Sequence, residues 1–466
     1  MRRYLNLLLN RVSMYKVVLI SLTILFVIAL FLSLVGSLAY TPLALIFSMV
    51  VLSMSVLLSS MLFGKLFGVA VHGESSFITG MILFFILPPS EEIGGLSLLV
   101  LAGMIAAASK FIFVYKGRHI FNPVAISAFL VGISGLMYAT WWVATPLLIL
   151  PTLLLGFIIM FKTRRLTMGA IFLVIATSLV LAMLVRDGST VGESLILLLS
   201  WPLLFFAGFM LSEPLTMAHK KWQRTLEACV VAVLFAVPLH FGDFTTSPAF
   251  ALLIGNLIAF SFSRKGAMAL EYVDSKEISS TSREFTFKTS RPAYFEPGQY
   301  MEITVPHAKA DLRGQRRVFS MTSAPGKSEI SFGVKFYSPS SSLKKTLTEL
   351  KTGSFIQSTG INGDFVLPKD TTLPLLLIAG GIGVTPFISH LRAMNMSGEK
   401  RDIVMLYAVK NLQDIAYDDF LQSSGVRLIV ISSAPKSTDQ KKYHHDVIQD
   451  QVIEEDVIRK HVKDIT

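Results

Sequence analysis

The stretch LLLIAGGIGVTP, residues 375–386, decides how the second half of this chain folds. An apolar run of the kind found in buried parallel strands ends in closely spaced glycines, and Thr385-Pro386 suits the first turn of a helix. In such a turn, backbone amides and the helix N-terminus face whatever lies beyond the strand. We predict a nucleotide-binding turn, although a tight strand-to-helix turn without a ligand has the same pattern. The candidate ligand-binding residues of this turn are Gly380, Gly381, Gly383, Thr385 and Pro386, which the resemblance described below assigns to the nicotinamide nucleotide.

Strands of two kinds are predicted around this turn. After it, 402–408 and 427–432 are apolar runs of the buried, parallel type, separated by helical stretches. Before it, short alternating segments lie between glycines and prolines, as in a small antiparallel barrel. These segments are 284–288, 300–305, 317–322, 329–336 and 354–359. We therefore predict an antiparallel β-barrel over residues 271–370 and an α/β nucleotide-binding domain over residues 371–466; the resemblance described below makes the first a flavin domain.

The barrel region contains groups suited to a flavin nucleotide. In Arg317-Val318-Phe319-Ser320, the arginine can bind a pyrophosphate, the aromatic ring can stack on a flat heterocycle, and the serine hydroxyl can bond a ring nitrogen. Ser341 and Ser342 precede a predicted helix, where they are candidates for phosphate binding or for a simple N-cap. Each short motif alone is also compatible with a purely structural role.

In this order and spacing, the motifs resemble the ferredoxin:NADP reductase superfamily over residues 275–435. The resemblance implies an FAD-binding FR-type domain with noncovalent FAD and NAD(P)H as substrate. It places Arg317 on the FAD phosphates, Phe319 against the isoalloxazine and Ser320 near its redox-active nitrogen. It also implies a catalytic role for Ser320 and Thr385.

Two further features follow from the same resemblance. Tyr407 and Lys410, after the second parallel strand, become candidates for binding the ribose or phosphate of the nucleotide. Members of the superfamily continue into a strand with a Cys-Gly-Pro segment, which this chain lacks. We therefore expect the nicotinamide side to be C-terminally incomplete, and FAD binding to be less affected than hydride transfer.

The first 265 residues have a different composition. The whole chain is 52% hydrophobic and only 16% charged, against about 45–50% and about 25% in soluble domains. Up to Lys265 there are 17 basic and 8 acidic residues. Apolar runs long enough to cross a bilayer predict a polytopic α-helical membrane domain, residues 1–265, of about ten spans. The predicted spans are 17–36, 42–63, 68–88, 94–113, 120–138, 141–161, 167–185, 195–211, 226–241 and 247–263.

The basic residues of this domain predict its orientation. Sixteen of the 17 fall on one side of the predicted membrane, and only Arg186 falls on the other. The positive-inside rule then places both termini in the cytoplasm of a multi-pass protein of the cell inner membrane. The lipid bilayer is thus a predicted partner, and the positive charge does not indicate nucleic acid.

Three segments of the membrane domain carry a second resemblance. SFITGMILFFILPP (76–89), KFIFVYKGRHIFNPVA (110–125) and FMLSEPLT (209–216) resemble the D subunit of the Rnf electron-transport complex and the related B subunit of sodium-pumping NADH:quinone reductase. The resemblance implies a membrane subunit that carries flavin and passes electrons, in some members coupled to ion movement. Residues implied near the flavin or electron path are Asn122, Pro123, Glu213 and Thr216.

Thr190 is a further candidate in this region. The family commonly has a Ser-Gly-Ala-Thr segment whose threonine carries covalent FMN, but this chain reads DGSTVGES at 187–194. Thr190 is therefore either a degenerate FMN acceptor or part of a plain polar loop, and we favour the loop.

The remaining composition narrows the function. Cys229 is the only cysteine, so this chain alone forms no cysteine-ligated iron-sulfur or zinc site, and we predict no metal. The few histidines of the membrane domain lie mostly at span ends, which disfavours a haem-binding ferric reductase. The favoured function is a membrane-bound oxidoreductase that passes electrons from NAD(P)H through FAD to a quinone, a second flavin or a partner protein. The alternative is a redox-driven or redox-regulated ion transporter of the Rnf type.

Overall fold

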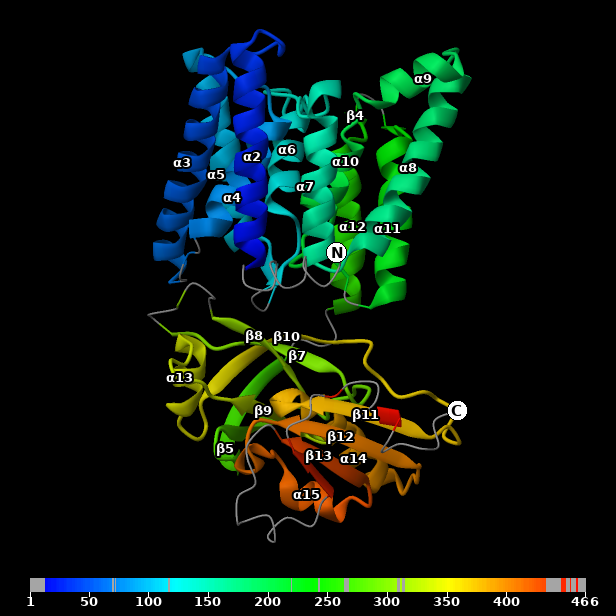
Figure 1. The fold of residues 1–466 in the computed structure, drawn as a ribbon. Helices are drawn as coiled ribbons and strands as arrows, with labels where there is room; N and C mark the ends of the chain where they lie inside the picture. The colour runs from blue at the N-terminus through cyan, green and yellow to red at the C-terminus, as the bar shows by residue number, and fades with distance from the viewer. Residues whose placement is uncertain are drawn as a thin grey trace. The chain divides into compact units, whose positions relative to one another are not determined.

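The computed structural model describes residues 13–68, 71, 73–115, 118–218, 220–241, 244–263, 268–307, 311, 315–432, 446–449, 453 and 458–459. Their contacts divide the chain into two compact units, Met1–Ser263 and Arg264–Thr466. We call these the helical unit and the sheet unit, after the elements that Figure 1 shows in each.

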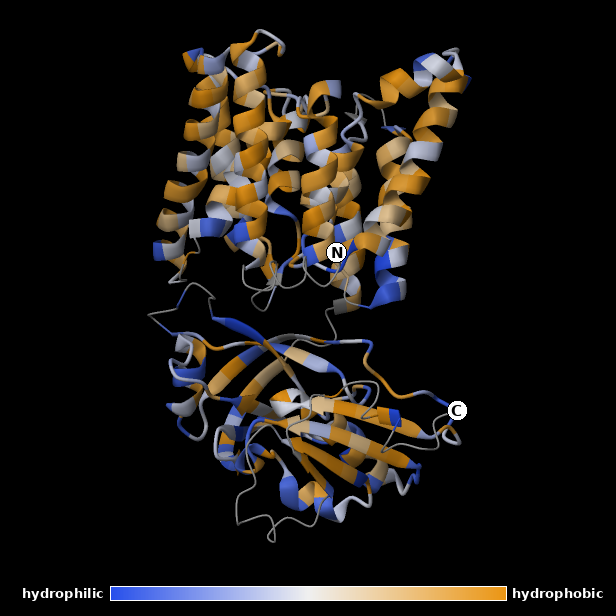
Figure 2. Cartoon of the chain, viewed as in Figure 1, coloured by the Kyte–Doolittle hydropathy of each residue, from blue (hydrophilic) through white to orange (hydrophobic). Residues whose placement is uncertain are grey.

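The helical unit consists of apolar helices joined by short loops. Large apolar side chains such as Phe31 and Leu66 are exposed on its outer faces, and Figure 2 shows hydrophobic residues along most of the helices. Exposed apolar surface of this extent is typical of a surface that contacts a partner or lipid. The elements are α2 (Met14–Leu34), α3 (Pro42–Phe67), α4 (Gly73–Ile86), α5 (Ile93–Ile112), α6 (Pro123–Ile133), η1 (Pro146–Leu148), α7 (Ile149–Lys162), α8 (Leu166–Arg186), α9 (Val191–Leu198), α10 (Leu203–Phe205), η2 (Phe206–Leu211), α11 (Lys221–Ala236) and α12 (Pro248–Ser263).

Four helices in the described ranges, α2, α3, α5 and α8, are long and apolar enough to cross a membrane. The bent pair of α9 with α10–η2, at 48°, makes a fifth if it crosses as one span. The predicted count of ten spans is not confirmed, because α4, α6, α12 and η1–α7 are apolar but shorter than the roughly 20 residues that the hydrocarbon core requires. The spans predicted from hydropathy at 68–88 and 120–138 are longer than the helices α4 and α6 that the structure shows there.

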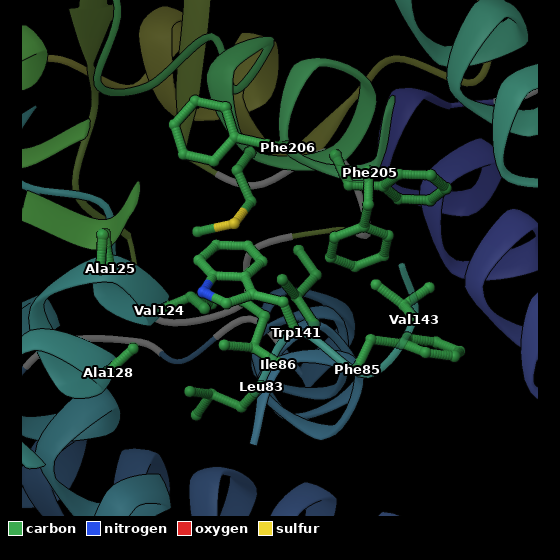
Figure 3. Close-up of a cluster of buried hydrophobic side chains, with 14 of the residues drawn as sticks. Leu83, Phe85, Ile86, Val124, Ala125, Ala128, Trp141, Val143, Phe205 and Phe206 are labelled. Atoms are coloured by element: carbon green, nitrogen blue, oxygen red, sulfur yellow. The ribbon is translucent and has the colours of Figure 1, made fainter. Parts of the chain in front are cut away.

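Aromatic and aliphatic side chains fill the centre of the helical unit. Figure 3 shows residues of α4, α6, the 141–143 segment and α10–η2 converging on one cluster. The rings of Phe85 and Phe205 lie 5.6 Å apart, and those of Trp141 and Phe206 lie 6.1 Å apart. Gly208 allows α7 to approach η2, since a Cβ there would lie 2.6 Å from the Cα of Gly156. The broken helices are therefore part of a packed core.

The order of elements recurs within the helical unit. Two successive sets of elements share one order: three helices or helix groups, a two-stranded β-ribbon and a last helix. The first set is α3, α4, α5, the ribbon β1–β2 and α6, and the second is α8, α9–α10–η2, α11, the ribbon β3–β4 and α12. In each set a short or bent helix comes second, and a proline, Pro123 or Pro248, begins the last helix. The last helices of the two sets, α6 and α12, pack against each other. The two ribbons are β1 (Val114–Tyr115) with β2 (Arg118–His119) and β3 (His240–Phe241) with β4 (Phe244–Thr245).

The first part of the sheet unit is an antiparallel barrel with the strand order β8-β7-β10-β5-β6-β9. Met321, directly after β8, bridges to Phe332 of β9, so the two edge strands of the sheet meet. Alternate residues such as Phe285 and Phe287 point into the core. The elements are β5 (Met268–Ser279), β6 (Ser282–Thr289), β7 (Tyr300–Thr304), β8 (Arg316–Ser320), β9 (Glu329–Lys335), α13 (Ser342–Thr348) and β10 (Phe355–Asn362).

The second part is a parallel sheet with the order β11-β12-β13-β14. Its strands β12 and β13 are apolar and mostly buried, whereas β11 is apolar but only partly buried. The sequence predicted these three apolar strands. The elements are β11 (Leu375–Gly380), η4 (Gly381–Val384), α14 (Thr385–Ser397), β12 (Ile403–Val409), η5 (Leu412–Asp414), α15 (Asp418–Ser423), β13 (Arg427–Ser432) and β14 (Asp446–Gln449). The predicted antiparallel and α/β parts are both present in the described residues.

Candidate functional site

Strand β8 carries the proposed flavin-binding residues. Its pairing with β7 sets Ser320 opposite Tyr300 and Arg317 opposite Ile303. Val318 is 53% exposed, while Arg317, Phe319 and Ser320 are half-buried. Phe319 packs on the barrel core, with its ring 6.2 Å from that of Phe332. The strand therefore holds these side chains at a fixed register at the edge of the sheet.

Arg317 lies in a polar cluster with the loop before it and the start of α13. Its Nη2 lies 3.5 Å from Oδ1 of Asp311. The other Asp311 oxygen accepts a hydrogen bond from the backbone N–H of Ser342 at 3.0 Å. Ser341 is the N-cap of α13, with its hydroxyl accepting from the N–H of Lys344. The structure thus links Arg317 to Ser342 through Asp311, with Ser341 next to them in the chain.

The glycine-rich turn joins β11 to α14. Gly381 has φ +49°, a conformation that glycine adopts without steric cost. A Cβ built on Gly380, Gly381 or Gly383 would meet open space. The Thr385 hydroxyl donates to the carbonyl of Ile382 at 3.0 Å and so stabilises the turn. The glycines leave the backbone accessible at the carboxyl end of the strand, which is where α/β sheets bind nucleotides.

Helix α14 is bonded to the chain that follows β8. Its Ser389 hydroxyl donates to the carbonyl of Ser323 at 2.9 Å. Arg392 Nη1 donates to Glu284 of β6 at 2.8 Å and to the carbonyl of Thr322 at 3.1 Å. These bonds fix the helix that begins at the glycine turn against the segment that follows Ser320.

Tyr417 completes this contact between barrel and parallel sheet. Its hydroxyl donates to Glu284 at 3.2 Å, and the Arg392 guanidinium lies over its ring. Burial, together with the nearby Glu284 carboxylate, raises the pKa of Tyr417 well above its usual value, so the hydroxyl stays protonated and can donate. The backbone of Tyr417 has φ +62°, which is uncommon for a bulky residue and indicates that this position is determined by its contacts.

The two residues predicted after β12 differ in their accessibility. Tyr407 is fully buried, and its hydroxyl accepts from the N–H of Ala416 at 3.1 Å. Burial raises the pKa of Tyr407 to about 12. The structure therefore places Tyr407 in the core, which corrects its assignment to the nucleotide. Lys410 is exposed at the carboxyl end of β12, the same edge of the sheet as the glycine turn.

These residues fit the groups that the sequence implies. The Asp311 carboxylate lies between the Arg317 guanidinium and the Ser342 amide. These two donors can therefore bind an anionic oxygen between them. The open space beside Gly380, Gly381 and Gly383 fits the close approach of a nucleotide to the backbone. The donor set of the barrel thus suits a dinucleotide phosphate, and the turn suits a second nucleotide.

A separate polar cluster lies in the helical unit, around Asn122. The side chain of Asn122 caps α6, with Oδ1 accepting from the N–H groups of Val124 and Ala125. Its Nδ2 donates to Glu213 at 2.7 Å, and its backbone N–H donates to Oδ1 of Asn256 on α12 at 2.8 Å. Asn122 and Asn256 are buried. Both sets of repeated elements therefore contribute to this cluster.

Glu213 joins further polar groups to the cluster. Thr216 donates to the same carboxylate oxygen at 3.4 Å. The Lys110 ammonium attracts the Glu213 carboxylate and donates to the carbonyl of Ser75 at 3.2 Å. Ionisable residues inside a membrane helix bundle are costly and usually functional. The structure thus brings together Asn122, Pro123, Glu213 and Thr216, which the sequence had singled out.

Thr190 is not part of this cluster in the structure. It is the N-cap of α9, where its hydroxyl accepts from the N–H of Glu193 and donates to the Glu193 carboxylate at 2.8 Å. This reciprocal capping box gives the Thr190 hydroxyl a structural role.

Sequence reasoning missed several residues of both clusters. Lys110 was counted only as a charge beside the membrane, and Asn256 sits in an apolar run where it drew no attention. Asp311, Glu284 and Arg392 belong to no motif, and only tertiary contacts reveal them. A polar residue within an otherwise apolar run, such as Asn256, is the one signal that was available from the sequence.

Comparisons with known proteins match the sheet unit. Residues 377–464 match the family model described as oxidoreductase NAD-binding domain. The flavohemoprotein of Bacillus cereus is 28% identical over 162 residues, which are 33% of this chain and 40% of that protein. The reductase component of propane 2-monooxygenase from Mycolicibacterium goodii is 33% identical over 133 residues, 28% of this chain and 36% of that protein. The chain thus spans well under half the length of these curated relatives.

Solved structures match the chain only at low similarity. The flavohem-like FAD/NAD-binding domain of nitric oxide dioxygenase from Vibrio cholerae is 20% identical, with a TM-score of 0.34, and the match covers 40% of this chain and 80% of that one. Phthalate dioxygenase reductase is 19% identical, with a TM-score of 0.30, over 36% of this chain and 61% of that one.

Proposed function

We propose a function from one premise: the C-terminal region of the chain is a ferredoxin–NADP reductase-like domain of the flavin- and NAD-binding kind. On this premise the chain is a membrane-bound oxidoreductase that passes electrons from NAD(P)H through FAD to an acceptor at the membrane. In the overall reaction with a quinone, NAD(P)H, one proton and the quinone become NAD(P)⁺ and the quinol.

The observation that carries the proposal is that the helix after the glycine turn is hydrogen-bonded to the segment that follows β8. α14 begins directly at the turn and is bonded through Ser389 and Arg392 to the residues that follow Ser320. The two elements proposed to bind nucleotides are thus joined by these hydrogen bonds. Hydride transfer requires a nicotinamide aligned against a flavin, and FAD supplies that redox chemistry when bound.

The residues of the chain would bind and orient the reactants. Arg317 would hold the phosphates by charge-assisted hydrogen bonds, and the Ser320 hydroxyl would hold a hydrogen bond at the flavin nitrogen. The amides of Gly381 and Gly383 would receive the nucleotide phosphate, while Lys410 would add positive charge at the same edge. Thr385, whose hydroxyl donates to the carbonyl of Ile382 in the turn, would act on the nicotinamide side.

The helical unit supports a membrane acceptor. Its long apolar helices are compatible with several spans, and its basic residues lie almost all on one predicted side. Both termini, and with them the sheet unit, would face the cytoplasm, where NAD(P)H is found. The expectation from the sequence that this unit is Rnf D-like belongs to the same proposal: electrons would pass inside the unit to a quinone, a second flavin or a partner protein.

A second candidate, redox-coupled ion movement, is favoured by the cluster around Glu213. A carboxylate and an ammonium group lie where two sets of repeated elements meet. Repeated elements with interrupted helices at a polar centre are a common arrangement in transporters. Ion flux that depends on NADH addition in proteoliposomes would support this candidate, whereas NADH oxidation without flux would leave the simple reductase.

Flavin analysis tests the proposal. The full chain is purified in mild detergent, and its flavin spectrum is recorded before and after denaturation. We expect one releasable FAD per chain and no flavin that remains covalently attached, with Thr190→Ala unchanged in both respects. Protein that binds no FAD, even when FAD is supplied, would contradict the proposal. Covalent flavin lost in Thr190→Ala would instead make Thr190 an FMN acceptor.

A further inference from the structure

The loop before β8 places a carboxylate on the arginine that the proposed FAD site needs. Asp311 Oδ1 lies 3.5 Å from Nη2 of Arg317, and its Oδ2 accepts from the backbone N–H of Ser342 at 3.0 Å. The side chains of Arg317 and Asp311 are 19% and 32% exposed. Their attraction is therefore only partly screened by solvent.

Other bonds hold Asp311 in this position. Its own backbone N–H donates to the Ser342 hydroxyl at 2.9 Å, so Asp311 and Ser342 are joined through two bonds. The ring of His307 bonds the same hydroxyl at 2.9 Å. Gln315 in turn donates to the carbonyl of His307 at 2.6 Å. The contact is thus supported by described residues on both sides of Asp311 in the chain, His307 and Gln315.

A carboxylate and a phosphate compete for such donors. Both present acceptor oxygens with negative charge, and both form charge-assisted bonds with a guanidinium group. One set of donors cannot hold two anions at once, because like charges at this spacing repel. Binding of a pyrophosphate by Arg317 therefore requires Asp311 to leave.

We propose that Asp311 is a built-in competitor for the FAD phosphates, which holds Arg317 in the flavin-free protein and lowers the affinity for FAD. The inference rests on the proposed function, because it assigns Arg317 to FAD. It predicts that loss of the Asp311 charge strengthens FAD binding. If Asp311 instead positions Arg317 for the cofactor, loss of the charge weakens FAD binding, so the sign of the change separates the two roles.

The test is a titration of the flavin-free full chain in detergent with FAD, followed by flavin fluorescence. We expect Asp311→Asn to lower the dissociation constant about fivefold, the effect of removing one partly exposed ion pair. Asp274→Asn, which removes an exposed carboxylate on β5, is the charge-matched control and should leave the constant unchanged. Ser342→Ala keeps the backbone amide but removes the hydroxyl that anchors Asp311, and it should also strengthen binding.

Two controls connect the effect to phosphate and to Arg317. Riboflavin has no phosphate, so its dissociation constant should be the same for wild type and Asp311→Asn. In an Arg317→Gln background, Asp311→Asn should no longer alter the dissociation constant for FAD, because the ion pair between Asp311 and Arg317 is already absent.

The outcomes are distinct. Unchanged or weaker FAD binding by both Asp311→Asn and Ser342→Ala would overturn the competitor role, and the proposed function would stand. Failure of wild type and both variants to bind FAD would overturn the proposed function and the competitor role with it. FAD binding by the variants but not by wild type would be the strongest form of the expected result.

Discussion

The helical unit and the sheet unit build their polar clusters in different ways. In the helical unit, Asn122 bonds Glu213 and Asn256, which lie 91 and 134 positions away in the chain. In the sheet unit, Arg317, Phe319 and Ser320 belong to one short strand, and the glycine turn is continuous. A cluster built from distant residues depends on the whole fold, whereas a motif on one strand depends mainly on local register. Substitutions in the two units should therefore differ in what they destroy.

The largest effect is expected from Glu213→Gln in the helical unit. Asn122 and Thr216 would lose the charged acceptor of their hydrogen bonds, and each such bond to a charged group contributes about 1.5–3 kcal/mol. We expect a clearly lower thermal unfolding temperature of the full chain in detergent. Glu92→Gln, at the exposed N-cap of α5, is the control and should unfold like wild type. Equal unfolding temperatures for Glu213→Gln and wild type would mean that this cluster does not stabilise the unit.

Arg317→Gln should affect the cofactor and leave the fold intact. The loss of a charge-assisted hydrogen bond costs about 1.5–3 kcal/mol, so FAD affinity should fall roughly 10- to 100-fold. Equilibrium dialysis of FAD measures this change. Arg283→Gln, which removes an exposed arginine paired with Glu277 on β5, should bind FAD normally. An unchanged affinity in Arg317→Gln would remove Arg317 from the phosphate site.

His390 should make the sheet unit sensitive to acid. It is buried on α14, and burial lowers its pKa from 6.5 to about 4. Below pH 6.5 the unfolded chain binds a proton that the folded chain does not, so stability falls as the pH falls toward 4. At pH 5 the loss is about 2 kcal/mol. His390→Gln should reduce the loss of unfolding temperature between pH 7 and pH 5, and an identical loss in the variant would refute this role.

The smallest effect is expected at the glycine turn, and there it should be confined to the nucleotide. A Cβ on Gly383 meets open space within the protein, so Gly383→Val should fold normally but obstruct the nucleotide. We expect about a tenfold higher KM for NAD(P)H, equivalent to about 1.4 kcal/mol, with unchanged FAD content. Gly398→Ala is the matched control, because Gly398 has φ +72° at the C-cap of α14. It should lose about 1 kcal/mol of stability and keep its KM. An unchanged KM in Gly383→Val together with a raised KM in Gly398→Ala would exclude a nucleotide at the turn.

The same difference between local and distant contacts explains what the sequence predicted. Arg317, Ser320 and the glycine turn occupy the predicted elements because strand register and turn chemistry are local. Tyr407 was assigned to the nucleotide from the resemblance alone, and the structure buries its side chain in the core because it lies on an inner strand of the sheet. The count of ten spans was not confirmed because an apolar run in the sequence can continue past the end of a helix, as it does at α4 and α6, which are shorter than a full span. Arg392 was missed because its partners Glu284 and Thr322 are distant in sequence. Asp311 was missed because it belongs to no motif, although Arg317 lies only six residues away.

The most direct test of the central claim is to mix the FAD-loaded full chain with NADH or NADPH in the absence of oxygen and to follow the flavin absorbance. The proposed function predicts rapid bleaching of the flavin by one of the two nucleotides, followed by recovery of the absorbance when a short-chain quinone is added. Bound FAD that stays oxidised with both nucleotides would contradict hydride transfer by this chain.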